Sequence, residues 1–380
     1  MLQVGSWFVL YYQAVRDRPK TPKYRHIFDT LQQQIVAGDF SAGDRLPSES
    51  ALVKQFGASR LTVNRALREL QASGAIRRRA GSGSYVEKST WPGGVFGLLI
   101  PDLGETEIFE PICRGMTEAQ VDTQHVLLWG KSPIDAKTKD AQALDICRQL
   151  VSKSVLGVFF APLELTPHNE ATNRSIAGLF DREGIPIVLL DRDLVPFPQR
   201  SRYDIVGIDN RRAGYVVTSH LLAQGCRRLV FVARPKSAPT IDLRIAGFLE
   251  ALWDSGQNPN RECVARIDPS DESSVRILMT ARKPDGIVCG NDYTAAVLMR
   301  TFQQIGLTAQ DIRMAGIDDV KYASLLPVPL TTIHQPCAAI GAAAMRAMLE
   351  RLADPTLPPR DIWIDFSLVV RESCRSGVTA

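Results

Sequence analysis

The sequence of 380 residues has little that would support catalysis on a metal or a cofactor. Its five histidines and seven cysteines are scattered, and none has a metal-ligand spacing such as Cys-x-x-Cys or His-Glu-x-x-His. Gly81 and Gly83 are not followed by the lysine and the Ser/Thr that a nucleotide-binding loop requires. No nucleophile stands at a recognisable spacing from a base. We therefore expect no metal, no cofactor and no enzymatic activity.

Long hydrophobic runs are also missing. The apolar patch at residues 7–12 is too short to cross a bilayer, and it lacks the basic start and the cleavage site of an export signal. Two interpretations of the extension at residues 1–19 stay open, a docking segment or an upstream start codon. Cysteines without evident partners fit a reducing compartment. We therefore predict a cytoplasmic protein with no membrane partner.

Positive charge is concentrated near the amino terminus. Residues 20–88 hold twelve Lys/Arg against six Asp/Glu, a net charge of +6, whereas the whole chain carries only +4. The remaining residues therefore sum to −2. Because neutralised phosphates release counterions, such a cationic segment is typical of a protein that binds a phosphate backbone.

Three short helices and a hairpin are predicted in this segment. Apolar side chains at one-turn spacing predict a helix over residues 23–37, and Ser48 and Gly57 delimit a second helix. Ser59 caps a third helix that ends at Gly74. Residues 75–79 and 84–86 then predict two strands joined by a glycine turn. This order is that of a winged helix-turn-helix DNA-binding domain over residues 20–87.

The polar face of the third helix carries side chains suited to DNA, namely Arg60, Leu61, Thr62, Asn64 and Arg65. Arginine and asparagine can make paired hydrogen bonds to base edges, so we expect this helix to enter the major groove. A solvated charged face is the alternative explanation for any one basic helix. The wing favours DNA, because Arg77, Arg78 and Arg79 follow one another along its first strand.

Three motifs of this segment, LPSE at 46–49, SRLTV at 59–63 and GSGSYV at 81–86, resemble the winged helix-turn-helix domain of the GntR family. The resemblance implies further DNA contacts from Ser48, Ser50, Ser59, Gly81, Ser82 and Gly83. The family usually has arginine where this chain has Asn64. The base read at that point is therefore left open, and asparagine is able to read adenine.

From residue 95 onward, short apolar runs alternate with helical stretches, which predicts an α/β architecture with parallel sheets. The expected strands are 95–100, 125–129, 157–160, 187–190, 205–208, 228–232, 263–267, 286–289 and 313–317, with a helix over 109–124. A single core rarely exceeds about 250–300 residues, so we expect residues 95–372 to form two doubly wound lobes with a ligand cleft between them. Residues 88–94 are the predicted linker, and 373–380 a tail.

Several segments of this region resemble the effector domain of the LacI family and the related periplasmic sugar-binding fold. They are LIPD at 99–102, VLLDR at 188–192, DNRRAG at 209–214, RIAGF at 244–248, GND at 290–292, AGIDD at 315–319 and LTTIHQ at 330–335. They span nearly all of residues 95–370. A GntR-type domain joined to a LacI-type sensor is the arrangement of arabinose-responsive repressors.

A bound sugar needs groups that replace the water around its hydroxyls, at the ends of strands, and a ring for its apolar face. The strand-end positions and the resemblance together predict effector contacts from Asp102, Phe109, Asp191, Arg244, Asn291, Asp292 and Tyr322. Structural roles are the alternative. Asp191 would then pair with Arg192, and Asp292 would cap the helix that follows it.

These features predict a homodimeric, sugar-responsive transcription regulator, with repression favoured, that binds palindromic operator DNA. A sugar between the lobes would change the spacing of the two DNA-binding domains. One alternative is the same role with a non-sugar effector such as a purine. A periplasmic sugar-binding protein would leave the basic segment unexplained, and an enzyme would need a catalytic constellation that no spacing here supplies.

Overall fold

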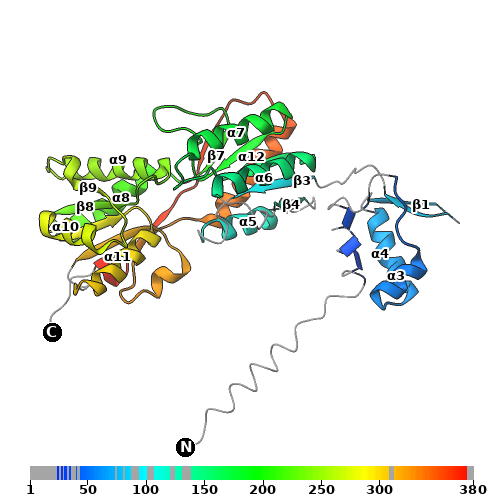
Figure 1. The fold of residues 1–380 in the computed structure, drawn as a ribbon, viewed down its shortest axis with the longest axis horizontal. Helices are drawn as coiled ribbons and strands as arrows, with labels where there is room; N and C mark the ends of the chain where they lie inside the picture. Colours follow the sequence, from blue (N-terminus) through cyan, green and yellow to red (C-terminus); the bar gives the residue numbers. More distant parts are fainter. Residues whose placement is uncertain are drawn as a thin grey trace, which may run out of the picture. The chain divides into compact units, whose positions relative to one another are not determined.

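The computed structural model describes residues 24, 27–28, 30–31, 34–35, 40, 43–72, 75–79, 82–86, 94–100, 107–119, 125–130, 138–307 and 312–374. The chain divides into two compact units, Met1–Gly94 and Val95–Ala380 (Figure 1). The extension at 1–19, Gly81, Asp102 and linker residues 88–93 lie outside the described residues. Among the helices that the structure describes, none combines the length and apolar character needed to span a bilayer.

The smaller unit has the predicted winged helix-turn-helix elements. They are α3 (Glu49–Phe56), α4 (Arg60–Ala72), β1 (Ile76–Arg79) and β2 (Gly83–Val86), preceded by helical residues between Tyr24 and Ile35. The Ser48 hydroxyl caps α3 by accepting a hydrogen bond from the Ala51 amide, and Gly57 ends it in the left-handed conformation. The hairpin pairs β1 with β2 antiparallel. Leu31, Leu52, Leu67 and Val86 share one core.

The larger unit consists of two six-stranded lobes, which confirms the predicted α/β fold. Lobe 1 has strand order β13-β7-β6-β5-β3-β4, from β3 (Val95–Leu99), β4 (Val126–Trp129), β5 (Gly157–Phe160), β6 (Ile187–Leu190), β7 (Asp204–Gly207) and β13 (Asp361–Trp363). Lobe 2 has the order β14-β12-β11-β10-β8-β9, from β8 (Leu229–Ala233), β9 (Val264–Arg266), β10 (Gly286–Cys289), β11 (Arg313–Asp318), β12 (Thr331–His334) and β14 (Ser367–Val369). All pairings are parallel except β12 with β14.

Helices cover both faces of each sheet. Lobe 1 is covered by α5 (Phe109–Glu118) and α12 (Cys337–Ala353) on one face, and by α6 (Lys139–Ser152) and α7 (Asn169–Arg182) on the other. Lobe 2 is covered by α8 (Asn210–Ala223) and α9 (Pro239–Asp254), and opposite them by α10 (Glu272–Arg282) and α11 (Asp292–Gln304). Because side chains of a strand alternate, Phe231 packs into one layer while Val230 and Val232 pack into the other.

Three parts of the sheet and helix pattern differ from the prediction. The strands β12, β13 and β14 were not predicted, because β12 is rich in threonine and β13 and β14 are three residues long with exposed or half-buried side chains. The helix expected over 109–124 is shorter, since α5 ends at Glu118 and the Ala119 amide bonds back to the carbonyls of Gly115 and Thr117. Six of the nine predicted strands differ from the observed β3, β4, β7, β8, β9 and β11 by one residue at one or both ends.

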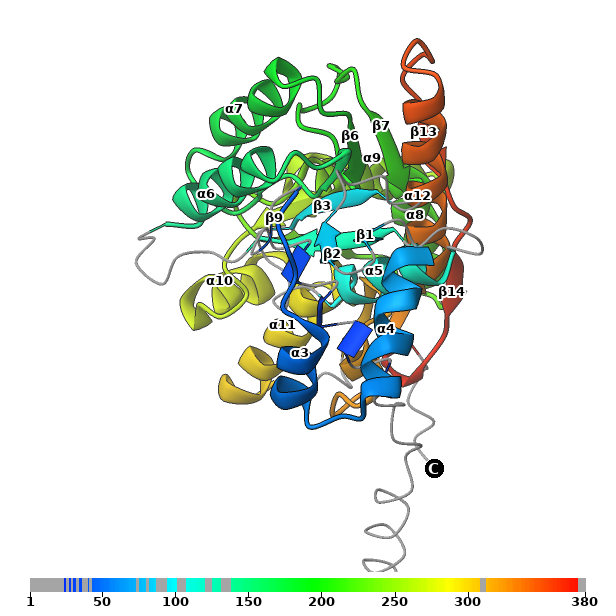
Figure 2. The ribbon, with the colours of Figure 1, turned by 90° about the vertical axis from the view of Figure 1, so that its right-hand side faces the viewer.

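The chain passes between the lobes three times. It leaves lobe 1 between β7 and α8, returns between β12 and α12, and leaves again between β13 and β14. Figure 2 shows α12, β13 and β14 along one side of the larger unit. Helix α8 packs against α9, and α5 packs against α12. Each pair needs a glycine where the two helices approach closely. A Cβ at Gly247 would lie 1.8 Å from the Arg211 carbonyl oxygen, and one at Gly341 would lie 1.9 Å from that of Ile112.

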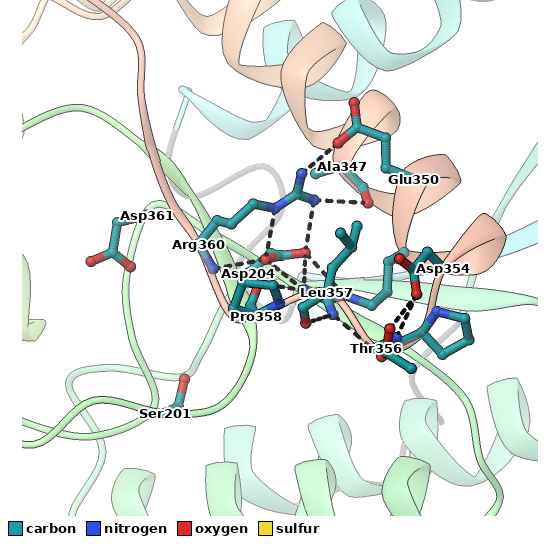
Figure 3. Close-up of polar contacts among 12 residues, drawn as sticks. Ser201, Asp204, Ala347, Glu350, Asp354, Thr356, Leu357, Pro358, Arg360 and Asp361 are labelled. Atoms are coloured by element: carbon teal, nitrogen blue, oxygen red, sulfur yellow. Dashed lines mark hydrogen bonds and ion pairs between the residues drawn. The ribbon is translucent and has the colours of Figure 1, made fainter.

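Asp204, at the start of β7, anchors the segment between α12 and β13 (Figure 3). Its carboxylate accepts hydrogen bonds from the guanidinium groups of Arg351, at 2.9 Å, and of Arg360, at 3.2 Å, and also from the Arg360 amide. Burial alone would raise the pKa of Asp204, but these bonds outweigh burial and lower its pKa below the usual value. The Asp204 cluster therefore joins β7, α12 and β13 as long as Asp204 is ionised.

We expect Asp204→Ala to destabilise the larger unit by about 3–5 kcal/mol, because Arg351 would lose its counter-charge and Arg360 would keep only the exposed Glu350. Denaturant unfolding of the full chain measures this. Glu350→Ala is the matched control. Its carboxylate pairs with the same Arg360 but is exposed, so the expected loss is about 0–1 kcal/mol. Equal losses in the two variants would contradict a special role for Asp204.

The same cluster predicts a dependence on pH. A carboxyl whose pKa is lowered by folding stabilises the protein above its unfolded pKa, near 4, and this stabilisation is lost as the pH falls. The difference in unfolding free energy between the parent protein and Asp204→Asn should therefore shrink between pH 6 and pH 3. Unfolding titrations at a series of pH values would check this, and a constant difference would contradict it.

Candidate functional site

The first turn of α4 presents an exposed surface suited to DNA. The side chain of Arg60 is 80% exposed and Leu61 is 84% exposed, although leucine is apolar. Ser48, Ser50, Ser59 and Arg65 are exposed as well, and Thr62 and Asn64 are half-buried. The Ser59 hydroxyl caps α4 by accepting a hydrogen bond from the Thr62 amide at 3.2 Å. The structure therefore gathers the predicted residues of α3 and α4, while their DNA contacts stay predictions.

The wing adds further cations to this unit. Arg77 and Arg79 are exposed, and the Arg79 guanidinium lies 5.3 Å from the ring centre of Tyr85. Ser82 and Tyr85 join their hydroxyls at 2.7 Å. Gly83 has a φ of +126°, which favours glycine, and a Cβ there would lie 2.8 Å from Nε of Arg45. Arg45 is a cation of the wing surface that the sequence analysis missed, because it lies far from the wing in the chain.

Arg78 is half-buried and contacts two side chains of other elements in the unit. Its Nη2 atom lies 2.5 Å from Oε1 of Glu49, and its Nη1 atom donates to Oδ1 of Asn64 at 3.2 Å. The Asn64 amide nitrogen in turn donates to Oε1 of Glu49 at 3.3 Å. Glu49 was not among the predicted site residues, and nothing in its position at the start of α3 indicated this role.

The larger unit has a cavity of about 460 Å³ between its lobes. Lobe 1 contributes Glu107, Ile108, Lys139, Glu164 and Leu165, and lobe 2 contributes Ala233, Arg234, Ser237, Ile241, Gly290, Asn291, Tyr293, Thr294, Asp318, Val320 and Tyr322. Of the predicted effector residues, Asn291 and Tyr322 line this cavity. The charged residues Glu107, Lys139, Glu164 and Arg234 were missed, because they lie on loops or, for Lys139, at the start of α6, and their approach to the cleft depends on how the lobes fold.

Asn291 and Tyr293 lie at the beginning of α11. Oδ1 of the Asn291 side chain accepts a hydrogen bond from the Thr294 backbone amide at 3.0 Å and therefore caps the helix. The Arg234 guanidinium lies 5.2 Å from the ring centre of Tyr293. The cavity wall in lobe 2 thus contains the capped first turn of α11 and the Tyr293 ring, which contacts the Arg234 guanidinium.

Arg244 is buried beneath the cavity and joins three parts of lobe 2. It donates to Asn210 at 2.7 Å and to the Gly290 carbonyl at 2.7 Å, and it lies 3.5 Å from the Asp318 carboxylate. Asp318 also accepts a hydrogen bond from Gln335 at 2.7 Å. Burial raises the pKa of Asp318, and Arg244 opposes that shift. Arg244 itself does not line the cavity, but it contacts Asp318, which does.

Asp191 lies at the end of β6 with a φ of +69°. One of its oxygens pairs with Arg192 at 3.3 Å, as the structural alternative predicted, and the other, Oδ1, is buried without a partner among the described residues. Burial raises the pKa of Asp191, and Arg192 and Arg244 oppose that shift. Asp191 lines a second hollow of about 330 Å³, between the loop after β6 and α9.

Asp292 and Phe109 are fully buried and lie outside the lining of the 460 Å³ cavity. The Asp292 carboxylate accepts hydrogen bonds from the Thr332 hydroxyl at 2.6 Å and from the Val320 amide at 3.1 Å. Burial raises the pKa of Asp292, and the nearby charge of Asp318 adds to the shift. Asp292 therefore supports the loop that carries Val320 and Tyr322. Its direct contact with an effector stays a prediction.

Hydrogen bonds join the two lobes around the cavity. The Ala238 amide donates to Oε2 of Glu164 at 2.9 Å, and Arg192 holds Oε1 of the same carboxylate at 2.9 Å. The Leu165 amide donates to the Lys236 carbonyl at 2.9 Å, and both residues have φ near +60°. The strained backbone on both sides marks this contact as one that tertiary structure imposes.

Within the described part of the chain, no group of three His, Cys, Asp or Glu residues could hold a metal ion. The polar groups of the cavity are suited to direct hydrogen bonding. Carboxylates accept from hydroxyl donors, while Arg234, Lys139 and the Asn291 amide donate.

Two segments of the chain match known families. Residues 23–86 match the family described as bacterial regulatory proteins, gntR family, and residues 218–374 match the periplasmic binding protein-like domain. The arabinose metabolism transcriptional repressor of Geobacillus stearothermophilus is 26% identical over 377 residues, which cover 93% of this chain and 98% of that protein. The ribose operon repressor of Halalkalibacterium halodurans is 27% identical and covers 75% of this chain and 80% of its own length.

Solved structures share the fold. The transcription regulator CcpA of Lactococcus lactis superposes with a TM-score of 0.62 at 19% identity and covers 74% of this chain and 99% of its own. The transcriptional regulator CelR in complex with cellobiose has a TM-score of 0.61 at 23% identity, over 83% of this chain and 90% of its own.

Because Glu164 bonds the Ala238 amide across the cleft, Glu164→Ala should expose that amide to exchange. Loss of a hydrogen bond to a charged group corresponds to exchange about tenfold faster or more. Hydrogen–deuterium exchange of the peptide around residues 236–241 measures this. In the control Glu170→Ala, which removes an exposed carboxylate paired with Arg174, exchange there should not change. Unchanged exchange in Glu164→Ala would rule out the bridge.

Proposed function

We propose that this protein, which joins a GntR-type helix-turn-helix domain to a periplasmic-binding-protein-like domain, is a transcriptional repressor whose operator binding is controlled by a sugar. The observation that carries this proposal is the presence, on one chain, of a basic winged helix-turn-helix unit and of a two-lobed unit with a polar cavity between its lobes. Neither unit alone would provide both DNA binding and its control by a sugar.

The geometry of the smaller unit supports sequence-specific binding. Arg60 and Leu61 project at the first turn of α4, where a recognition helix meets base edges in the major groove. Arginine suits a guanine edge, and an exposed leucine suits a thymine methyl group. Arg77 and Arg79 of the wing, with Arg45, suit the phosphate backbone. A single domain of this type covers one half-site, so we propose that a homodimer binds a palindromic operator.

The chemistry of the cavity favours a sugar. Three carboxylates, Glu107, Glu164 and Asp318, face it together with the donors Lys139 and Arg234, so that hydroxyl groups find both acceptors and donors. Tyr293 and Tyr322 supply rings for the apolar face of a sugar ring. The names of the relatives, an arabinose metabolism repressor and a ribose operon repressor, support a pentose as the first candidate.

Control of DNA binding follows from the contacts between the lobes. Glu164 and Leu165 of lobe 1 line the cavity and also bond to lobe 2. A sugar that contacts both walls stabilises the closed arrangement, and it shifts the conformational equilibrium only by its difference in affinity for the two states. A coupling of about 1–3 kcal/mol changes operator affinity about 5- to 150-fold.

Arg60→Ala should weaken operator binding about 5- to 150-fold through the loss of a base contact, while binding to random duplex falls much less. Gel-shift titrations of the full-length protein against a selected operator and against random DNA measure both affinities. An equal loss on both DNAs would show that Arg60 contacts phosphate and no base.

Asp318→Asn should remove most of the rise in melting temperature that a bound pentose causes, because the cavity would lose a charged acceptor that Arg244 and Gln335 hold in place. Thermal-shift screening with pentoses, hexoses, disaccharides and nucleobases identifies the ligand first. Asp242→Asn, on the exposed face of α9, is the control and should respond as the parent does. A full response in Asp318→Asn would remove Asp318 from the binding site.

A further inference from the structure

A second hollow lies between the lobes, separated from the 460 Å³ cavity by the first turn of α9. Ser237 and Ile241 line the cavity, whereas Pro239, Thr240 and Leu243 line the hollow. Within the described ranges, no residue lines both spaces. The volume of the hollow, about 330 Å³, is near the lower end of the range for small-molecule sites, about 300–1,000 Å³. The larger unit therefore has room for two ligands at once.

Both lobes form the walls of this hollow. Lobe 1 contributes Val195, Phe197 and Pro198 from the loop after β6, together with Trp363 of β13. Lobe 2 contributes Leu243 of α9. These five side chains are apolar, and we call the space that they line the aromatic hollow. A molecule that fills it contacts both lobes.

Two aromatic rings at the aromatic hollow are exposed. Phe197 is 79% exposed and Trp363 is 45% exposed. Large apolar side chains gain free energy when they leave water, and a group of them on the surface often marks a binding site. Aromatic rings also pack well on other rings, either offset or edge to face. The rings therefore favour a ligand with an aromatic body.

The charged side chains around the aromatic hollow already have partners. Arg200 donates to Asp361 at 2.7 Å, and Asp193 accepts hydrogen bonds from two backbone amides. Arg192 donates to a backbone carbonyl and to two carboxylates. One acceptor is left over. Oδ1 of Asp191, which also lines the hollow, is buried, and no donor reaches it in the part of the chain that the structure describes.

The left-over oxygen of Asp191 sets the polar chemistry of the ligand. Burying an acceptor without a hydrogen bond is costly, so a ligand that donates to this oxygen would remove an existing cost. A carboxylate only accepts hydrogen bonds, and the matching group is therefore a hydroxyl or an N–H. This chemistry differs from that of the 460 Å³ cavity, whose donors and acceptors suit a molecule with many hydroxyl groups.

We propose that the aromatic hollow is a second small-molecule site, for an aromatic compound with one hydrogen-bond donor, of the phenol or indole class. Because its ligand contacts both lobes, occupation of the hollow favours their closed arrangement and tightens the binding of a sugar in the other cavity. Only this coupling rests on the proposed function. By linkage, each of the two ligands changes the affinity for the other by the same factor.

Isothermal titration calorimetry of the full-length protein with two matched pairs of probes tests the site. Indole and phenol each carry one donor, and in 1-methylindole and anisole a methyl group replaces the donated hydrogen. Indole and phenol should bind about tenfold more tightly or better than their methylated partners, because the methylated rings cannot donate to Asp191. In Asp191→Asn this ratio should shrink, since a neutral amide oxygen accepts a weaker hydrogen bond than a carboxylate.

Trp363→Ala removes one ring of the aromatic hollow and should weaken indole binding about tenfold. Phe197→Ala, a change in an exposed loop side chain, provides a second route if Trp363→Ala is unstable. Trp253→Ala is the matched control, because Trp253 is also exposed, at 56%, but lies in the last turn of α9 and does not line the hollow. Its affinity for indole should equal that of the parent protein.

The coupling is measured by repeating the titrations with the second ligand present. A saturating pentose should lower the Kd of indole about 5- to 150-fold, and indole should lower the Kd of the pentose by the same factor. If no sugar binds, the proposed function fails, whereas the titrations with indole alone still decide whether the hollow is a site.

Four results would overturn the inference. They are no binding of indole or phenol, equal affinities within each pair of probes, equal effects of the changes at Trp363, Phe197 and Trp253, and a Kd of indole that a bound pentose leaves unchanged. Sedimentation analysis of Trp363→Ala adds one more check. Loss of a dimer in this variant would assign the exposed rings to a contact between two copies of the chain and would also contradict a small-molecule site.

Discussion

The three passages of the chain between the two lobes are the constraint on which the larger unit depends. They connect the two lobes without interrupting either sheet, and they bring the carboxyl ends of both sheets to one cleft. The Asp204 cluster fixes the segment between α12 and β13 to lobe 1, just before the third passage, because the ionised carboxylate is bound by Arg351 and Arg360. The cavity exists because these passages hold its walls opposite each other.

Charged side chains are buried beneath and beside this cleft. Arg244 pairs with Asp318, and Arg192 pairs with Asp191 and Glu164, so two guanidinium groups partly offset the charge of three carboxylates beneath and beside the cavity. One oxygen of Asp191 still has no partner among the described residues. Such a group is costly to bury, and a hydroxyl donor from a ligand would satisfy it.

In the smaller unit, too, a carboxylate pairs with an arginine. Glu49 binds Arg78, and the pair holds Asn64, while Arg60, Arg77 and Arg79 remain exposed. Glu49 thus sets the half-buried Arg78 apart from cations whose side chains stay exposed, although its other oxygen lies 3.5 Å from Arg60. A count of charges alone does not distinguish the two groups.

The sequence by itself determined the local elements and the kind of fold. Apolar periodicity, Ser48, Gly57 and Ser59 predicted α3 and α4, and the strand runs predicted most of both sheets, since these signals lie within a few residues of one another. It also indicated Asn291 and Asp191 as residues at strand or helix ends, whereas Arg244, expected at the start of a helix, lies within α9. Tertiary structure decided which side chains share a site: it joined Glu49 to Arg78, brought Glu164 to the Ala238 amide, and placed Asp292 against Thr332 beneath the cavity. Contacts between residues far apart in the chain depend on packing, which no local pattern encodes.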